Sequence, residues 1–385
     1  MTAALQARAV PNAALAADGR GLIERMFGDT DTYLEHERWQ RPLLRRAITS
    51  PFILSADDIW AMIDAEILDV SNAEFRLVRA TETGFDAAPS GRYAVWRETT
   101  DGKALIPQPE AVRDLVAQGY SIAAQLLDRR DPTLGGACAA LSAWTGHPTQ
   151  VSAYLSPAAG GALQVHHDTH DVVILQGAGR KTYDLFDPVI DRPIPTVHLD
   201  PLELAGVAPR ATVTLEPGDM LYLPRGIPHR AQSGADGSLH LTVGFLSITW
   251  SSLMRSLADD LVYVADLRDA LTAGEIFDGA ALAFAADAAA QALAAWVRTE
   301  GGPRLAALAA QSLLTSFALR DPADPLAPEG CAMVAIDPSP CGGATLRSPT
   351  SAERFAPGDP ELQAWFQAYP ETDATATQIP SRDTV

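Results

Sequence analysis

Three residues in two short segments have the types and spacing of a metal site. In the segment Gly161–Asp168, His166 and Asp168 are two positions apart, so on an extended chain both side chains point to one side. A third candidate ligand, His229, follows a turn and a short apolar run, Gly218–Leu223. Two neutral imidazoles and one carboxylate satisfy one face of an octahedral Fe(II) ion and leave its other positions open. The pattern therefore predicts a metal centre with room for a cosubstrate and oxygen.

Neither segment is strong evidence alone, because a His-x-Asp sequence recurs by chance on polar loops. Their occurrence in this order inside one strand-rich block favours a joint metal site over that ordinary alternative. Two more histidines flank the pair. On an extended backbone His167 faces away from His166 and Asp168, whereas His170 shares their parity and is a candidate for the mouth of a substrate pocket.

The metal candidates lie in a block of short strands separated by turns. Turn-forming stretches stand at Pro157–Gly161, Gly177–Gly179, Pro217–Gly218 and Gly234–Gly237. Many short strands at such intervals indicate a sandwich or barrel, in which the two metal segments can meet. The expected strands are Val151–Leu155, Asp171–Gln176, Lys181–Phe186, Thr212–Leu215, Met220–Leu223 and Ser238–Phe245.

Helical patterns precede and follow this block. Before it, Ser55 with Asp58 three residues on resembles a capping box at the start of a helix. After Trp250, the apolar faces of the helices need a partner, which is a helical bundle, a second subunit or the barrel itself. The expected helices are Asp57–Glu66, Pro109–Ala117, Asp131–Gly146, Ser251–Leu271, Gly279–Thr299 and Arg304–Leu319.

The patterns along the chain predict five parts. Residues 1–18 lack the basic and apolar segments of a secretory signal and are expected to be a mobile leader. Residues 19–250 form the catalytic domain, 251–320 a helical region and 321–370 a small segment that begins as a Pro- and acid-rich linker. Residues 371–385 lack apolar periodicity, which predicts disorder. The small segment is expected to contain a hairpin and a short helix: Met333–Ile336, Ala344–Arg347 and Pro360–Ala368.

The composition excludes several classes of function. The chain has 385 residues and a net charge of -19, with a pI near 4.7, which argues against a nucleic-acid partner because clustered Lys and Arg are absent. The alanine-rich run Ala280–Val297 is interrupted by Asp287 and Gln291, which favours an amphipathic helix over a membrane span. The 3 cysteines lack the spacing of a disulfide framework or a zinc site, and this fits a reducing cytoplasm.

These residues together resemble a known family. Gly218–His229 matches the second cupin motif, and His166–Lys181 resembles the JmjC-type ribosomal oxygenases. The similarity covers about Gly19–Thr249 and includes the stretch Trp39–Leu44. The resemblance implies a mainly β fold with helices: a double-stranded β-helix, the cupin or JmjC jelly roll, with N-terminal helices and a C-terminal helical region. It also implies Fe(II) as the metal and 2-oxoglutarate as the cosubstrate.

The same resemblance assigns residues to the cosubstrate. Lys181 would hold the distal carboxylate of 2-oxoglutarate, and Tyr154 on the preceding strand is a second contact. Lys181 follows the turn-forming Gly177–Gly179, so its strand is expected to run back beside the metal strand. Thr242 and Ser152 would line the pocket. The ordinary alternatives are a solvated lysine at 181 and a threonine at 242 present for its β-propensity.

The resulting function hypothesis is a hydroxylase that acts on an unactivated C–H bond and releases succinate and CO2. Its substrate would be a protein or peptide side chain, and a natural-product or peptide-tailoring hydroxylase is the alternative with the same chemistry. A metal-binding cupin without oxygenase turnover, such as a sensor, is the alternative from another class. Family members carry a helical dimerisation region and a winged helix, and here the helices predict a homodimer while any winged helix within 321–370 is curtailed.

Overall fold

The computed structural model describes residues 13–309 and three short strands beyond them. Within 13–309 the description omits residues 53, 73, 82–83, 100–101, 159–164, 196–205, 259–260, 262–263, 303–304 and 306–307. The chain divides into two compact units, of which one is Ala14–Ser247 and the other joins Met1–Ala13 to Ile248–Val385.

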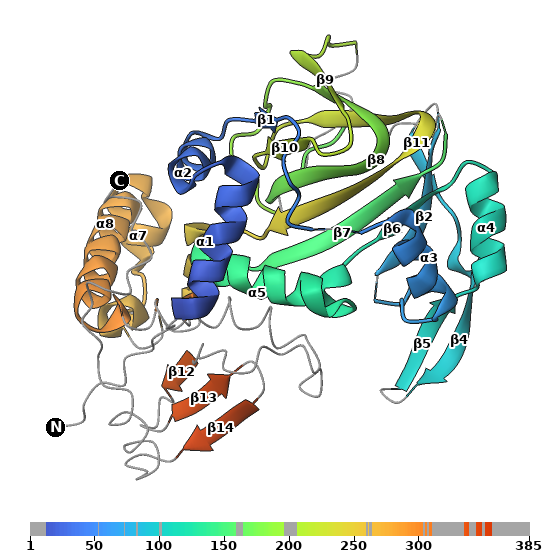
Figure 1. Cartoon of the computed structure of the whole chain (residues 1–385). Helices are drawn as coiled ribbons and strands as arrows, with labels where there is room; N and C mark the ends of the chain where they lie inside the picture. Colours follow the sequence, from blue (N-terminus) through green and yellow to red (C-terminus); the bar gives the residue numbers. More distant parts are fainter. Residues whose placement is uncertain are drawn as a thin grey trace. The chain divides into compact units, whose positions relative to one another are not determined.

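The unit Ala14–Ser247 is built on one antiparallel sheet. In the described part of the chain this is a 9-stranded sheet in the order β1-β10-β8-β11-β7-β6-β2-β3, with β9 paired to β8 (Figure 1). Long β8 and β11 lie at its centre, and β11 pairs with β7 on one side and β8 on the other. The strands are β1 Leu43–Arg45, β2 Phe75–Thr81, β3 Gly84–Ala87, β6 Ser121–Ala124, β7 Thr149–Ser156, β8 Asp171–Leu185, β9 Ala211–Leu215, β10 Met220–Leu223 and β11 His229–Phe245.

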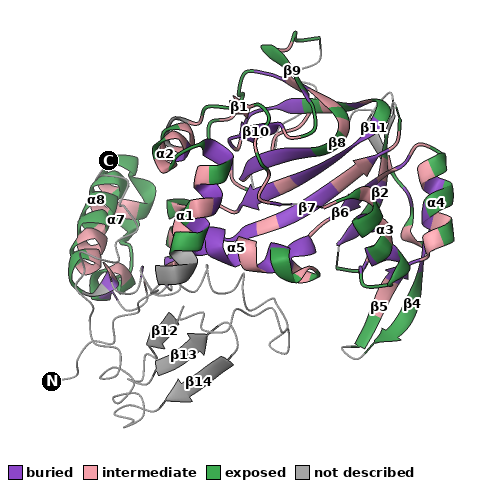
Figure 2. Cartoon of the chain, viewed as in Figure 1, coloured by how far each residue is buried: buried purple, intermediate pink, exposed green. Residues whose placement is uncertain are grey.

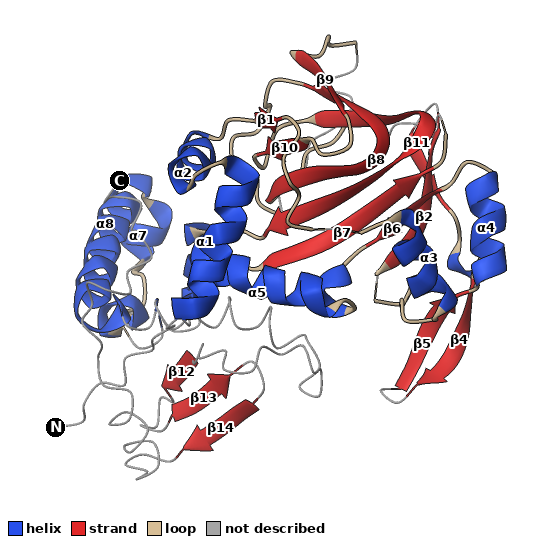
Figure 3. Cartoon of the chain, viewed as in Figure 1, coloured by secondary structure: helices blue, strands red, loops and turns tan. Residues whose placement is uncertain are grey.

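Helices and a separate hairpin surround the sheet (Figure 3). The hairpin pairs β4, Ala94–Thr99, with β5, Gly102–Pro107. The predicted fold class, mainly β with helices on a jelly-roll core, is confirmed. The helices of this unit are α1 Ala13–Phe27, α2 Thr30–Trp39, α3 Ala56–Asp64, α4 Pro109–Ala117 and α5 Pro132–Thr145, with the 3-10 turns η1 Ser90–Arg92 and η2 Leu127–Arg129.

The two faces of the central strands belong to different hydrophobic clusters. Residues on what we term the helical face pack in one cluster with the buried residues of α1 and α5, and include Val173, Leu175 and Leu241. Their neighbours on the opposite, inner face form a second cluster: Val172, Ile174, Tyr183, Leu185, Leu215, Leu221, Leu223 and Ile227. Because both faces of β8 are covered, residues 172–175 form an unbroken apolar run, and Figure 2 shows the central strands as mostly buried.

One prediction in this block is wrong: Asp171–Gln176 and Lys181–Phe186 are not two strands joined by a turn. They belong to the single 15-residue strand β8. The register with β11 shifts at Gly177, because Leu239 pairs with Ala178 while His240 pairs with Gln176. This bulge changes the alternation of side chains. Even-numbered residues before Gly177 and odd-numbered residues after it therefore share the inner face.

The N-terminal helices are largely as predicted. Ser55 and Asp58 form a complete capping box on α3, in which the Asp58 amide donates to Ser55 Oγ at 3.2 Å and the Ser55 amide donates to Asp58 Oδ2 at 2.7 Å. The leader was predicted to extend to residue 18, but α1 begins at Ala13. Alanine-rich sequence favours helix, and burial of residues such as Ile23 later in α1 stabilises the whole segment. Residues 1–12 lie outside the described part.

The unit that contains residues 248–309 is helical. The helix predicted at Ser251–Leu271 is shorter, since α6 is Trp250–Leu257 and a separate 3-10 turn follows at Ala265–Arg268. The next helices are α7, Ala273–Phe277, and α8, Gly279–Trp296, which continues into a π turn. The prediction at Arg304–Leu319 lies mostly outside the described residues.

Apolar side chains on α7 and α8 are exposed. Phe277 is 87% exposed and Phe284 is 80% exposed. By length and composition alone, Gly279–Thr299 is apolar enough to cross a membrane, although a single such helix is weak evidence and Asp287 interrupts it. Whether this surface meets a second copy of the chain stays a prediction.

The small C-terminal segment contains a three-stranded antiparallel sheet. Strand β12, Ala335–Pro338, pairs with β13, Ala344–Ser348, which confirms the predicted hairpin. A further strand, β14 at Ser351–Phe355, was not predicted and pairs with β13. The predicted helix Pro360–Ala368 and the tail 371–385 lie outside the described residues.

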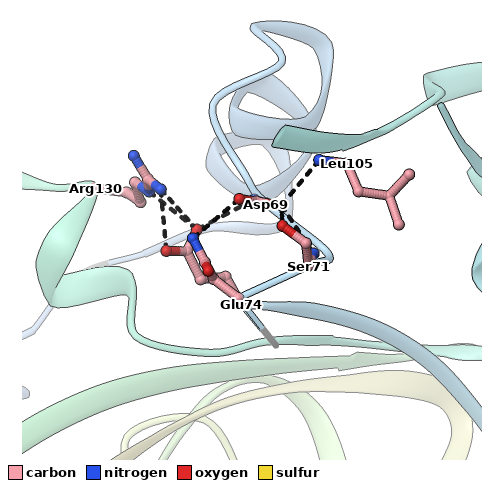
Figure 4. Close-up of polar contacts among 6 residues, drawn as sticks. Asp69, Ser71, Glu74, Leu105 and Arg130 are labelled. Carbon is pink, nitrogen blue, oxygen red and sulfur yellow. Dashed lines mark hydrogen bonds and ion pairs between the residues drawn. The ribbon is translucent and has the colours of Figure 1, made fainter. Parts of the chain in front are cut away.

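A buried polar network ties the elements beside β7 together (Figure 4). Arg130 donates to both carboxylate oxygens of Glu74, at 3.0 and 2.9 Å, and the Asp69 amide donates to Glu74 Oε2 at 3.1 Å. The carboxylate of Asp69 accepts from the Leu105 amide at 3.0 Å. Glu74 is 2% exposed, and burial raises its pKa although Arg130 opposes that shift. The network fixes the entry to α5 and hence to β7.

Replacing Arg130 by alanine leaves the Glu74 carboxylate buried without its counter-ion. We expect the free energy of unfolding to fall by about 3 kcal/mol, as judged by urea denaturation, because an unpaired buried charge is strongly unfavourable. The matched control is Arg210→Ala, whose partner Asp187 forms with it an ion pair that is 71% and 74% exposed. That loss should stay below about 1 kcal/mol. Equal losses would contradict a stabilising role for the network.

Candidate metal and cosubstrate site

The backbone brings the two predicted metal segments together directly. His229, the first residue of β11, pairs with Leu185 of β8 and also forms an isolated antiparallel bridge with His166. The His166 amide donates to the His229 carbonyl at 3.1 Å, and the His229 amide donates to the His166 carbonyl at 2.8 Å. Two segments more than sixty residues apart in sequence therefore face each other as a strand pair.

The three predicted ligand side chains converge at this bridge. The rings of His166 and His229 have centroids 4.5 Å apart, and Nε2 of His229 is 4.0 Å from Oδ2 of Asp168. Two atoms that each bind one ion at about 2.1 Å lie no more than about 4.2 Å apart, so this separation suits a shared ion. As they stand, no three His, Cys, Asp or Glu side chains among the described residues form a closed metal-binding group. The 4.5 and 4.0 Å separations bring the three donors to one place on the sheet.

The protonation of His229 suits a metal ligand. Its Nδ1 lies 3.1 Å from the Ile227 carbonyl oxygen, and an N–H at Nδ1 that donates to this oxygen leaves Nε2 with a free lone pair on the side of Asp168. Burial, with His166 nearby, lowers the pKa of His229 to about 4, which keeps the ring neutral. For Asp168, burial acts to raise the pKa, but His229 and His166 outweigh it and the carboxylate stays ionised. The donor chemistry is that of two imidazoles and one carboxylate.

The loop that leads into His229 has a shape that depends on Gly226. The Gly226 amide donates to the Asp168 carbonyl at 3.0 Å, which ties the two metal segments at a second point. Gly226 has φ +86, and an added Cβ would stand 2.6 Å from Cδ of Pro193 and 2.9 Å from the Ile190 carbonyl oxygen. Only glycine combines this backbone conformation with this close approach.

Lys181 reaches the inner face because of the bulge in β8. It lies two residues before the inner-face Tyr183 and pairs with Ser233 of β11 and Leu215 of β9. The chain turns tightly beside it, since Gly179 has φ +61 and an added Cβ there would lie 2.1 Å from the Gly237 carbonyl oxygen. Burial lowers the pKa of Lys181 to about 8, and no carboxylate among the described residues pairs with its ammonium. A desolvated, unpaired ammonium is suited to an anionic ligand.

The other predicted cosubstrate residues share this face. Tyr154 pairs with His240, and Ser152 pairs with Thr242, which in turn pairs with the inner-face Ile174. Burial raises the pKa of Tyr154 to about 12, so its hydroxyl stays protonated and can donate. Because it pairs with Ile174, Thr242 lies on the inner face, as its predicted cosubstrate role requires. A threonine present only for its β-propensity could occupy the same position.

The two other histidines near the metal segments, His167 and His170, are both partly buried. His170 lies against Gly244 of β11, where an added Cβ would meet its ring at 2.9 Å, and it is partly buried. Its role at a substrate mouth stays a prediction. His167 is also partly buried, with a buried Nδ1. Gln176 has a structural role, because its amide donates to the Ala178 carbonyl at 2.7 Å and to Ser238 Oγ at 2.9 Å.

Two inner-face residues were missed in the sequence. Tyr183 lies on the inner face near two histidines, with its ring centroid 6.5 Å from that of His229 and 6.4 Å from that of His240. His240 is 5% exposed and stacks on Tyr154. The sequence could have identified His240, because it lies two residues before Thr242 and alternation along one strand puts both side chains on the same face. Tyr183 could be placed only once the bulge was known.

The part of the chain that holds the predicted metal and cosubstrate residues matches a known protein family. Residues 137–253 match the family model of the JmjC domain, and they contain most of α5, strands β7 to β11 and the predicted metal and cosubstrate residues. Over these residues the chain is similar to JmjC domains. This match confirms the JmjC part of the predicted resemblance, and the relatives named below include ribosomal oxygenases.

The chain is similar to curated relatives over about a hundred residues. It is 37% identical over 117 residues to the bifunctional lysine-specific demethylase and histidyl-hydroxylase NO66 of Dictyostelium discoideum, covering 29% of this chain and 23% of the relative. It is 34% identical over 114 residues to ribosomal oxygenase 2 of Rattus norvegicus, covering 29% and 24%. It is 32% identical over 101 residues to the ribosomal protein uL16 3-hydroxylase of Escherichia coli, covering 26% of each. The chain thus matches about a quarter of the length of these relatives.

Among solved structures, the chain is similar to YcfD, a ribosomal oxygenase from Escherichia coli, in complex with cobalt and succinic acid. The TM-score is 0.49 at 16% sequence identity, over 87% of this chain and 88% of that one. A structure of the same protein with cobalt and 2-oxoglutarate has a TM-score of 0.48 at 15% identity, over 87% and 88%.

Replacing His229 or Asp168 by alanine removes one proposed metal ligand. We expect the dissociation constant for Mn(II), measured by calorimetry, to rise by more than about 100-fold, since even second-layer partners are worth 10- to 100-fold. The circular dichroism spectrum should be unchanged, because the ligands are not core residues. His36→Ala on α2 is the histidine control and should bind normally. Normal Mn(II) binding by both ligand variants would show that the metal lies elsewhere.

Proposed function

We propose that this chain is an Fe(II)- and 2-oxoglutarate-dependent oxygenase that hydroxylates a side chain of a protein or peptide. The observation that carries the proposal is the pairing of two features on one barrel. His166, Asp168 and His229 gather at the strand bridge, and the buried ammonium of Lys181 lies on the inner face of β8, with no carboxylate partner among the described residues. A cupin that only binds a metal has no need for that second feature.

In this proposal His166, Asp168 and His229 hold the iron. When bound, Fe(II) supplies the redox chemistry that couples decarboxylation of 2-oxoglutarate to hydroxylation, with succinate and CO2 as coproducts. Lys181 neutralises the distal carboxylate of the cosubstrate, and Tyr154 donates from the facing strand. The apolar inner cluster around Tyr183 and Leu221 keeps water from the pocket and strengthens these charge interactions.

A protein substrate is supported by the names of the relatives, which include a ribosomal protein hydroxylase and a histidyl-hydroxylase. The net charge of -19 fits a basic partner, because an acidic surface attracts a basic segment over long range. Ribosomal proteins are one such class.

The test is succinate formation with basic ribosomal peptides in the presence of Fe(II), 2-oxoglutarate and oxygen. We expect turnover in the wild type and a loss of about 30-fold or more in 2-oxoglutarate affinity for Lys181→Ala, because a charged partner of a desolvated carboxylate is removed. Lys103→Ala, an exposed lysine on β5, is the control. No 2-oxoglutarate-dependent turnover with any peptide would count against a hydroxylase. Unchanged binding in Lys181→Ala would remove the cosubstrate assignment.

A further inference from the structure

His240 is a buried histidine in the middle of β11 on the inner face. It pairs with Tyr154 of β7 and with Gln176 of β8, and it is 5% exposed. Its neighbours Leu239 and Leu241 lie on the helical face and are apolar, as expected in a buried strand. Packing alone would favour an apolar residue at 240 as well. Because packing does not explain the imidazole at this position, we expect it to have a polar function.

The orientation of the ring is fixed by two tyrosines. His240 stacks on Tyr154 with ring centroids 5.0 Å apart and an interplanar angle of 8°. Tyr183 meets it edge-on, at 6.4 Å and 85°. Offset stacking and edge-to-face contacts are the favoured arrangements of such rings. A ring held on two sides keeps its nitrogen atoms at set positions, as a ligand-binding donor requires.

The polar atoms around this ring are not satisfied within the described part of the chain. Nδ1 of His240 is buried without a hydrogen-bond partner there, and so is the hydroxyl of Tyr183. Leaving a buried polar atom unpaired is unfavourable, and native interiors rarely tolerate it without a reason. Both atoms lie on the face that carries Lys181. A polar ligand bound on this face would satisfy them together.

The charge state of His240 points to an anion. Burial, with the ammonium of Lys181 nearby, holds the pKa of His240 well below its ordinary value. The ring is therefore neutral and offers one N–H donor beside a cation. An ammonium is a point charge whose donors rotate, whereas a fixed ring N–H has a direction. Two such donors side by side suit one carboxylate.

We propose that His240 is a cosubstrate-binding residue whose Nδ1–H donates to the carboxylate held by Lys181. This inference rests on the proposed function, because it concerns the same pocket. Lys181 supplies the charge, and His240 sets the plane of the carboxylate. The ligand class is a 2-oxo dicarboxylic acid.

Three variants of the full chain test this role. His240→Phe keeps a ring against Tyr154 but lacks the donor, His240→Asn places an amide nitrogen near the position of Nδ1, and His240→Gln places one near Nε2. Each protein is titrated by calorimetry with Mn(II) and then, loaded with Mn(II), with 2-oxoglutarate. We expect about tenfold weaker 2-oxoglutarate binding for His240→Phe and His240→Gln and recovery to within about threefold for His240→Asn. Mn(II) affinity should change less than about twofold.

Two results would overturn the inference: 2-oxoglutarate binding by His240→Phe that matches the wild type, or binding by His240→Asn as weak as that of His240→Gln. If His240→Phe does not fold, as judged by circular dichroism, the comparison of the two amide variants decides. A wild type that binds Mn(II) but not 2-oxoglutarate would overturn the proposed function and this inference with it. A wild type that binds both, with unchanged variants, would overturn this inference alone.

Discussion

The register of β11 between β7 and β8 is the constraint on which the site depends. One strand pairs His229 with Leu185 and with His166 at its start, and pairs His240 and Thr242 with Tyr154 and Ser152 farther along. Because side chains alternate along a strand, a slip of one residue would turn every one of these groups onto the helical face. Metal donors and pocket residues are therefore held in one register by the same backbone hydrogen bonds.

Each covered face of the central sheet serves a different purpose. The helical face joins the core with α1 and α5 and supplies most of the buried apolar surface. The inner face carries a smaller cluster with polar groups set into it, among them Lys181 and His240. In such surroundings a charge is weakly screened and its pKa moves far from the ordinary value, as the shift of Lys181 to about 8 illustrates. A rigid apolar scaffold makes these few polar groups effective toward an anion.

The bulge at Gly177 and the tight approach of Gly179 to Gly237 allow β8 to contribute apolar residues to the helical face and Lys181 to the inner face. Without the extra residue, the parity of β8 would place Lys181 on the helical face, among residues such as Leu175. Irregular positions next to binding sites are a recurring way to redirect a side chain within a regular strand. The strand stays buried on both faces, so the redirection leaves the core intact.

The sequence by itself determined the elements and the donor chemistry. His166 and Asp168 have strand spacing, Gly218–His229 has the turn and loop residues of a second motif, and Ser55 with Asp58 marks a helix start, because all three depend on neighbours within about ten residues. Tertiary structure alone decided that residues 171–185 form one strand, that Lys181 faces inward and that His240 lies beside it. Two glycines close together, such as Gly177 and Gly179, are compatible with a turn or with a bulge, and only pairing with the neighbouring strand decides between them. The burial of His240 likewise depends on residues from three different strands, β7, β8 and β11.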